Sequence, residues 1–154
     1  MSAPQNPAEA TPLDLDTFLC FAVYSAGHAF NQLYRPLLDA LGLTYPQYLV
    51  MVTLWQQDDV TVKEIGQRLF LESSTLTPLL KRLETLGYIS RNRDPEDERQ
   101  VRVRLTPTGA GLREKARTIP PCIGAATGLS SETLQRLVTE LGATRDSILA
   151  STSD

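Results

Sequence analysis

Apolar residues recur at helical spacing along most of the chain and alternate with polar ones in only one short stretch. Residues 13–41 and 44–55 each carry apolar side chains three and four positions apart, which predicts two helices. Beyond Thr106 the same spacing predicts two more, the first interrupted at the prolines 120–121 and the second capped by Ser130. The chain is therefore predicted to be mainly helical.

The middle of the chain predicts a tighter motif. Thr61 and Glu64 form a capping-box pattern, in which each side chain accepts a hydrogen bond from the other residue's backbone N–H. A turn at 71–73 separates this short helix from a second one, which Gly87 ends. Two short helices joined by a tight turn are typical of a helix-turn-helix.

The second of these helices separates apolar from polar residues. Its apolar stripe consists of Leu76, Leu79, Leu80, Leu83 and Leu86. We place its start near Ser73, because Pro78 is tolerated best in a first helical turn. The opposite face is rich in hydroxyl and cationic side chains, which suits base edges and phosphates at a major groove. Candidates for base contacts are Ser74, Thr75, Thr77 and Pro78, and candidates for phosphate contacts are Lys81 and Arg82.

Between positions 88 and 105 the period changes to two, which predicts a β-hairpin with a turn at 94–97. At its tip the Asp97 carboxylate can hold the Arg99 guanidinium, and a pre-oriented arginine loses less freedom on entering a minor groove. We expect Arg93 to contact phosphate and Arg99 to probe the minor groove. Each arginine by itself is most simply a solvated charge, but a helix-turn-helix followed by such a hairpin predicts a winged helix-turn-helix that reads duplex DNA.

Composition and charge fit one domain with a local positive face. The chain has 154 residues, 42% of them hydrophobic, and no apolar run long enough to span a membrane. Its net charge of −3 is uneven, because residues 61–106 carry a net +2 and the remainder a net −5. A local positive field of this kind suits a nucleic-acid surface. No cofactor is expected, and His28 with two widely separated cysteines is no convincing metal-ligand set.

The termini predict how the chain is organised. Residues 1–12 are polar and carry no signal-like features, so we expect a disordered tail there and a cytoplasmic protein. Residues 13–151 are expected to form a single domain, with 13–43 and 107–151 as a helical dimerisation region and 44–106 as the DNA-binding lobe. The terminal helices carry more apolar surface than such a lobe needs, which predicts a homodimer. Two recognition helices one DNA turn apart would then read a pseudo-palindromic operator. The expected fold is mainly α, with a small β-hairpin wing.

Segment 61–106, with Asp97-Glu98-Arg99 in the wing and Leu105-Thr106 closing it, resembles the MarR family of dimeric transcriptional regulators. Residues 19–25, 34–37 and 43–48 are similar to the organic-hydroperoxide-sensing branch of that family, OhrR. The resemblance implies a non-enzymatic repressor that occupies its operator while reduced and leaves when an N-terminal cysteine is oxidised. It also implies that two tyrosines hydrogen-bond this cysteine. The matching tyrosines are Tyr34 and Tyr45, with Tyr24 at a further matching position.

Cys20 is the cysteine that matches. In an apolar helical segment a cysteine is most often a small core residue. A sensing role needs the thiolate, because the thiolate attacks the peroxide O–O bond. Tyr24 lies one helical turn away, and with Tyr34 and Tyr45 it could stabilise that anion by donating O–H bonds. The apolar neighbours expected to favour organic peroxides over hydrogen peroxide are Phe18, Leu19 and Phe21.

Cys122 is the second thiol, and taken by itself it is most simply a packed or exposed cysteine without a functional role. A permanent disulfide is not expected in a cytosolic protein, whereas a transient one suits a redox sensor. By resemblance to the two-cysteine form of OhrR, we predict that Cys20 of one subunit becomes a sulfenic acid and then condenses with Cys122 of the other.

Two other functions stay open on the sequence. In one, a MarR-type repressor responds to a small phenolic or lipophilic ligand, and both cysteines are dispensable. In the other, the chain is a thiol peroxidase in which Cys20 attacks and Cys122 resolves. The complete wing and recognition helix argue against the peroxidase, which needs neither.

Overall fold

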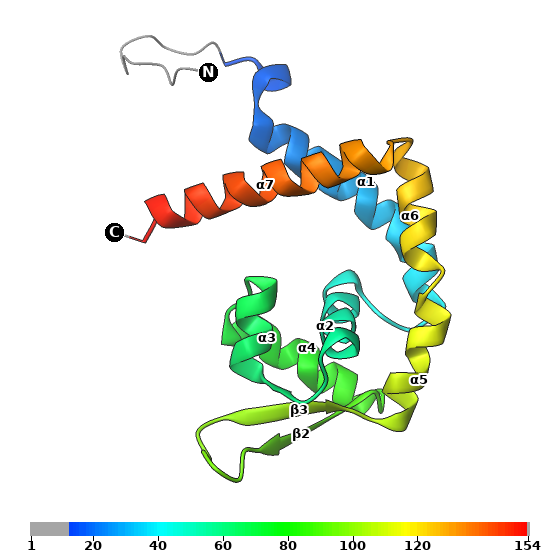
Figure 1. Cartoon of the computed structure of the whole chain (residues 1–154), viewed down its shortest axis with the longest axis vertical. Coiled ribbons are helices and arrows are strands. Elements are labelled where there is room, and N and C mark those ends of the chain that lie inside the picture. Colours follow the sequence, from blue (N-terminus) through cyan, green and yellow to red (C-terminus); the bar gives the residue numbers. More distant parts are fainter. Residues whose placement is uncertain (1–12, 154) are drawn as a thin grey trace. The chain divides into compact units, whose positions relative to one another are not determined.

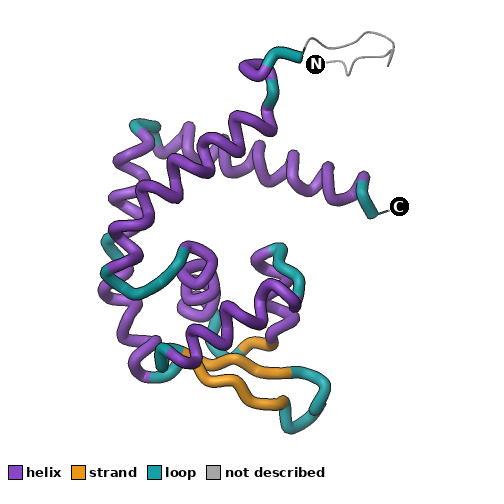
Figure 2. Tube along the Cα trace, turned by 180° about the vertical axis from the view of Figure 1, so that it is seen from behind, coloured by secondary structure: helices purple, strands orange, loops and turns teal. Residues whose placement is uncertain are grey.

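The structure, a computed structural model, describes residues 13–153, and the predicted tail over residues 1–12 lies outside them. The chain divides into two compact units, residues 1–45 and 46–154. Figures 1 and 2 show that helices dominate and that the strands form one small sheet. Within residues 13–153, no helix combines the length and hydropathy needed to cross a bilayer.

The first unit is helical. It contains a short 3₁₀ helix η1 (Leu15–Thr17) and the long helix α1 (Leu19–Asp39). The sequence predicts one helix over residues 13–41, but Phe18 adopts an extended backbone conformation and separates η1 from α1. Pro36 lies inside α1 without ending it, three residues before the last one.

Helix α2 (Tyr45–Gln56) leads into the helix-turn-helix, which consists of α3 (Val62–Leu69) and α4 (Ser73–Thr85). The predicted capping box is present at the start of α3. The Glu64 N–H donates to Thr61 Oγ1 at 3.1 Å, and the Thr61 N–H donates to Glu64 Oε2 at 2.7 Å. Two backbone N–H groups that have no acceptor within the helix are thus bonded by side chains, which fixes where the helix begins.

Gly87 ends helix α4, as the sequence predicts. It adopts φ +80°, a left-handed conformation that costs glycine little. The Gly87 N–H donates to the Glu84 carbonyl at 3.0 Å and the Tyr88 N–H donates to the Leu83 carbonyl at 3.0 Å. These two bonds form a Schellman motif and turn the chain directly into the first strand of the wing.

The sheet has three antiparallel strands in the order β1-β3-β2. Strands β2 (Ile89–Arg93) and β3 (Val101–Leu105) form the predicted hairpin, with Arg91 opposite Val103. Strand β1 (Val60–Thr61) pairs with the other edge of β3 and is a correction to the prediction, which contained only the hairpin. Two residues are too few to show an alternating pattern, so this strand left no sequence signal.

The C-terminal region forms α5 (Pro107–Ala116), α6 (Ile119–Thr127) and α7 (Ser131–Ser151). The helix predicted from Pro107 breaks two residues before the prolines 120–121, which lie in the first turn of α6. A first turn tolerates prolines because its N–H groups have no helical partner. Ser130 caps α7 as predicted, accepting from the Thr133 N–H at 3.2 Å.

The core of the second unit lies where α2, α3, α4 and the sheet pack together. The residues of these four elements that are at most 2% exposed are Val50, Met51, Leu54, Ile65, Leu76, Leu80, Leu83, Ile89 and Val103. The leucine stripe predicted for α4 is therefore its packed face, with Leu79 and Leu86 half-buried beside it. The mainly helical architecture with a β-hairpin wing is confirmed.

Candidate nucleic-acid interface and cysteine sites

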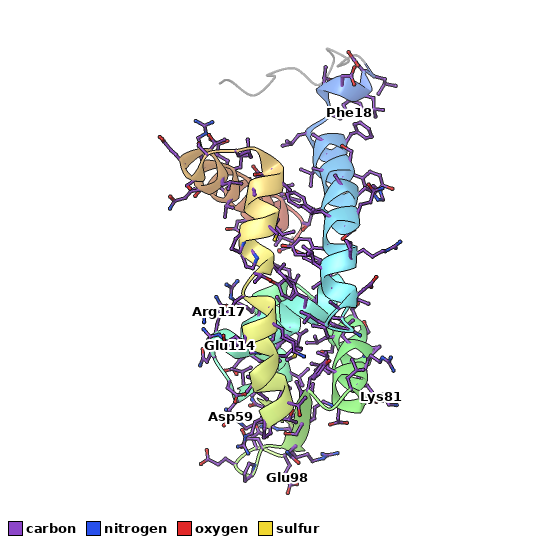
Figure 3. All side chains as sticks on the ribbon, turned by 90° about the vertical axis from the view of Figure 1, so that its right-hand side faces the viewer. Phe18, Asp59, Lys81, Glu98, Glu114 and Arg117 are labelled. Carbon is purple, nitrogen blue, oxygen red and sulfur yellow. The ribbon has the colours of Figure 1, made fainter. Side chains whose placement is uncertain are left out.

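The solvent face of α4 carries the residues predicted to contact DNA. All six are exposed: Ser74, Thr75, Thr77, Pro78, Lys81 and Arg82. Figure 3 shows Lys81 projecting away from the helix, and among residues 13–153 neither Lys81 nor Arg82 has an ion-pair partner. Cations without carboxylate partners are available to phosphates.

Two details of this face bear on hydrogen bonding. The Thr77 hydroxyl donates to the Ser73 carbonyl at 2.7 Å, so its oxygen remains free to accept. Pro78 lies inside α4, in its second turn, and has no N–H to donate to the Ser74 carbonyl. The face therefore presents acceptors beside its cations, a combination suited to base edges in a groove.

The tip of the wing holds the predicted ion pair. Arg99 Nε lies 3.1 Å from Asp97 Oδ1, and the Arg99 side chain is 91% exposed. Arg93 donates from Nη1 to the Glu98 carbonyl at 3.2 Å, across the turn of the hairpin. Both arginines are thus exposed to solvent and held in place from within the wing.

A groove brings the helix-turn-helix and the wing onto one surface. Its lining includes Thr77 from α4 and Arg99 from the wing, together with Lys63 from α3. Its described lining holds three cationic residues and no carboxylate. Lys63 was not among the predicted contacts, because the sequence marked its neighbours Thr61 and Glu64 only as a helix start.

An ion pair ties the recognition helix α4 to the wing. Arg91 on β2 meets Glu84 on α4, with Arg91 Nη2 at 3.2 Å from Glu84 Oε1. The Arg91 backbone N–H also donates to Glu84 Oε2, at 3.2 Å. The hydrogen bond from the Arg91 side chain holds the pKa of the Glu84 carboxyl below its usual value. Arg91 therefore positions the wing rather than offering a free charge.

A second ionic cluster surrounds Asp59, in the turn before β1. Arg102 and Arg104 of β3 both reach its carboxylate, and Arg102 also meets Asp94. Hydrogen bonds from Arg104 and Arg102 lower the pKa of Asp59, and the pKa of Arg102 is raised in return. Sequence reasoning missed this cluster, because its partners lie 43 residues apart and no local pattern links them.

Both cysteines are free and exposed, so neither is the small core residue that an apolar helix usually makes of a cysteine. Cys20 lies in the first turn of α1, and Cys122 lies in α6, one residue after the Pro-Pro pair. Among the apolar neighbours of Cys20, Leu19 is exposed, whereas Phe18 and Phe21 are half-buried.

The three tyrosines lie in two places along the first unit. Tyr24 follows Cys20 by one helical turn and packs edge-on against His28, with ring centroids 4.5 Å apart. Tyr34 and Tyr45 form a pair with centroids 4.7 Å apart. Partial burial raises the pKa of Tyr45, so its hydroxyl stays protonated to a higher pH than that of an ordinary tyrosine.

The helix rise separates that pair from Cys20 in one subunit. Tyr34 lies fourteen positions after Cys20 in α1, which corresponds to about 21 Å along the helix axis. One chain therefore brings Tyr24 close to Cys20 but keeps Tyr34 at the far end of the same helix.

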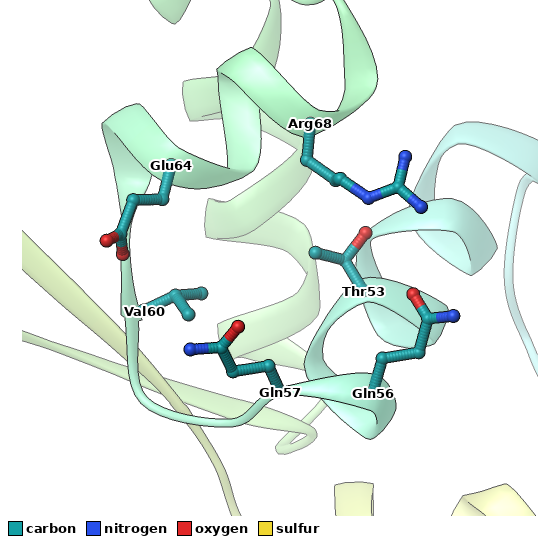
Figure 4. Close-up of a pocket in the computed structure, with 6 residues that line it drawn as sticks. All are labelled: Thr53, Gln56, Gln57, Val60, Glu64 and Arg68. Carbon is teal, nitrogen blue, oxygen red and sulfur yellow. The ribbon is translucent and has the colours of Figure 1, made fainter.

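A polar hollow lies between α2 and α3 (Figure 4), with Thr53 and Gln56 on one side and Glu64 and Arg68 on the other. The Glu64 carboxylate already caps α3, so part of this lining belongs to the start of the helix. Among residues 13–153, no group of three or more metal-ligating side chains comes together.

A helix-turn-helix, a cationic recognition face and an arginine-tipped wing define a winged-helix DNA-binding protein. Residues 32–116 match the family model for the transcriptional regulator SarA/Rot. The chain belongs to this family of MarR-type transcriptional regulators.

Two named relatives agree with this assignment. The chain is 51% identical over 139 residues to the HTH-type transcriptional regulator TtmR of Methylorubrum extorquens, covering 90% of the chain and 71% of TtmR. It is 46% identical over 129 residues to the organic hydroperoxide resistance transcriptional regulator of Bacillus subtilis, covering 84% and 88% respectively. The resemblance to OhrR is confirmed, and the named relatives are transcriptional regulators rather than peroxidases.

Solved structures of AbfR, a protein of Staphylococcus epidermidis, share the fold. Reduced AbfR bound to DNA matches with a TM-score of 0.72 at 37% identity, covering 85% of the chain and 91% of AbfR. Disulfide-formed AbfR matches with a TM-score of 0.60 at 36% identity, covering 82% and 88%. Both forms of AbfR therefore share the fold of the chain.

Proposed function

We propose that this DNA-binding regulator is a cytoplasmic homodimeric repressor that leaves a pseudo-palindromic operator when an organic hydroperoxide oxidises Cys20. The observation that carries the proposal is the position of Cys20. It is an exposed thiol in the first turn of a 21-residue helix whose only buried residue is Leu38. A hydroperoxide therefore reaches this sulfur without entering the packed core of its own subunit.

Unpartnered apolar faces support the homodimer. Helix α1 exposes Leu19, Val23, Tyr24 and Phe30, each by 41% or more. Helix α7 has 21 residues and none of them is buried, and its exposed apolar residues are Leu137, Val138, Leu141, Ile148 and Leu149. Apolar faces of this extent on a DNA-binding regulator are best explained by a second copy of the chain.

In the operator complex, α4 enters the major groove and the wing follows the adjacent minor groove. Ser74, Thr75, Thr77 and Pro78 contact base edges, while Lys81, Arg82 and Arg93 contact phosphates. Arg99, held by Asp97, enters the minor groove. The groove that joins α4 to the wing, lined by cations, supports this placement.

The sensing step begins at the Cys20 thiolate. The sulfur attacks the terminal oxygen of the hydroperoxide, the O–O bond breaks, and the products are a sulfenic acid and an alcohol after protonation. The sulfur is oxidised by two electrons and the peroxide is reduced. Tyrosine hydroxyls near the sulfur favour the thiolate by donating to it.

Tyr24 of the same chain is one such donor. The Tyr34–Tyr45 pair lies too far along α1 to serve the same subunit's cysteine, so we assign it to the Cys20 of the partner subunit. An antiparallel crossing of the two α1 helices would bring it there.

Cys122 of the partner subunit then resolves the sulfenic acid. Its thiol condenses with the oxidised sulfur, a disulfide forms, and water leaves. A disulfide supplies about 2–4 kcal/mol, enough to shift a dimer that has two arrangements of its DNA-binding lobes. AbfR has been seen both reduced on DNA and with a disulfide formed, which supports two such arrangements in this family.

Non-reducing electrophoresis of protein treated with cumene hydroperoxide tests the pairing. The wild type should run as a covalent dimer that dithiothreitol returns to monomer, while Cys122→Ser and Cys20→Ser should remain monomeric. A wild-type monomer band with all thiols oxidised would contradict the pairing. A covalent dimer in Cys122→Ser would assign the bond to other sulfur atoms.

A further inference from the structure

The carboxylate of Asp59 holds two arginines of the wing, and this cluster lies wholly within the second unit. Arg102 Nε is 2.8 Å and Arg104 Nε is 3.0 Å from Asp59 Oδ1. Arg102 also donates from Nη2 to the Asp59 backbone carbonyl at 2.6 Å and reaches Asp94 at 3.3 Å. The side chain and the backbone carbonyl of Asp59 thus both bind arginines of strand β3.

The turn is built to present Asp59 in this way. Asp59 adopts φ +56°, a left-handed conformation that is unusual for a residue with a side chain and that aspartate tolerates better than most. Asp58 fixes the turn, because its Oδ1 accepts from the Asp59 N–H at 2.7 Å and from the Leu105 N–H at 2.8 Å. The turn before β1 is therefore bonded to both the side chains and the backbone of β3.

The wing arginines divide into two groups by exposure and partner. Arg102 is 28% exposed at its side chain and is held from two sides, by Asp59 and Asp94. Arg99 is 91% exposed and is held by one residue of its own turn. Hydrogen bonds from Arg104 and Arg102 lower the pKa of Asp59, so its carboxylate stays ionised to a lower pH than that of an ordinary aspartate. The charges of the Asp59 cluster therefore fix the position of strand β3 and are not offered to phosphate.

We propose that Asp59 is a positioning residue for DNA binding, which holds the wing at the angle from which Arg99 reaches the operator flank. The inference rests on the proposed placement of the wing along DNA and is independent of the cysteine chemistry. The inference predicts a change in DNA affinity that is opposite in sign to the one expected from net charge alone. Removing a negative charge from a DNA-binding lobe strengthens its general attraction to phosphate. Loss of this carboxylate should instead weaken operator binding.

The test uses reduced full-length dimer and a duplex selected by the wild-type protein from a random-sequence library. Asp59→Asn keeps the size of the side chain and tolerates the left-handed conformation, and Asp59→Gly tolerates it without any side chain. We expect both to bind roughly three- to tenfold more weakly, since an unheld wing must be ordered on binding. Hydroxyl-radical footprints should lose protection at the operator flanks and keep it at the centre.

Glu96→Gln is the matched control. It removes the same charge from the wing turn, where the Glu96 side chain is exposed and forms no ion pair within the described residues. We expect it to bind as well as the wild type or more tightly, with the flanks still protected. Thermal melting followed by circular dichroism confirms that every variant is folded at the assay temperature.

Wild-type affinity and unchanged flank protection in both Asp59 variants would overturn the inference. So would an even loss of protection over the whole site, because that indicates damage to the lobe and not to the wing. Arg99→Ala, measured in the same assay, distinguishes the proposed placement of the wing on DNA from the proposed role of Asp59. If it keeps flank protection, the wing does not lie on the flank. If it loses protection while the Asp59 variants keep it, only the role of Asp59 fails.

Discussion

The Arg99 side chain is exposed to solvent and is nevertheless held in one orientation. Its side chain is 91% exposed, yet Asp97 holds its guanidinium at 3.1 Å. An exposed surface ion pair contributes little to stability, so this pair is better understood as pre-orienting a contact than as holding the fold together. The cost of immobilising a long side chain on DNA is then partly met before binding.

Arg99→Ala should weaken operator binding by about tenfold and leave thermal stability unchanged, because the lost contact is to DNA and not to the protein. Fluorescence anisotropy at one fixed salt concentration measures the affinity. Arg117→Ala is the control, since it removes the same charge from an exposed residue just after α5. Equal losses in the two variants would indicate a general effect of charge and remove Arg99 from the interface.

Residue contacts were predictable from the sequence where the partners are neighbours in the chain. The capping box of Thr61 and Glu64 and the Asp97–Arg99 pair each span two or three residues, so backbone geometry alone brings them together. The Asp59–Arg102 pair depends on how β1 meets β3, which no local pattern specifies. The DNA-contact roles of the α4 residues stay predictions.

The junction between the wing and α5 depends on a glycine that sequence reasoning passed over. The Trp55 indole N–H donates to the Gly109 carbonyl at 2.9 Å, and the Thr106 hydroxyl accepts from the Gly109 N–H at 3.0 Å. A Cβ on Gly109 would lie 1.9 Å from the Tyr88 carbonyl oxygen, closer than any real contact. Helix α5 can approach the end of the recognition helix only because this side chain is absent.

Gly109→Ala should therefore lower the free energy of unfolding by about 2–3 kcal/mol, since backbone atoms must move to admit the methyl group. Gly111→Ala is the matched control in the same helix, where a Cβ has no atom within 4 Å. It should raise the free energy of unfolding by about 0.5–1 kcal/mol, because alanine is the better helix former. Urea denaturation of both variants measures the difference, and a similar change of the same sign in both would contradict the close approach.

The sequence predicted helices and strands well where a pattern continues for several residues. The leucine stripe of α4 and the alternation of the hairpin have that length, and each has its own stop signal. Strand β1 has two residues and showed no pattern. The Pro-Pro pair indicated a break in the helix but not whether the prolines lie before or after it. In the structure they lie after the break, in the first turn of α6.

The dimer is where the sequence was least informative. Exposed apolar residues on α1 and α7 indicate that a partner covers them, but the crossing of the helices depends on side-chain packing between two chains. Whether Cys20 and Cys122 meet depends on that crossing. The fold and the regulator family are shown by the relatives, while the redox chemistry stays a proposal that only the oxidised dimer can test.

Operator affinity before and after oxidation is the most direct test of the redox proposal. A duplex selected by the reduced wild-type protein is titrated at one salt concentration with wild type and Cys20→Ser, with and without cumene hydroperoxide. Both proteins should bind equally when reduced. Peroxide should weaken the wild type by at least about a hundredfold and leave Cys20→Ser unchanged, because the variant lacks the sulfur that is oxidised. Peroxide-induced release of Cys20→Ser to the same extent as the wild type would contradict the account.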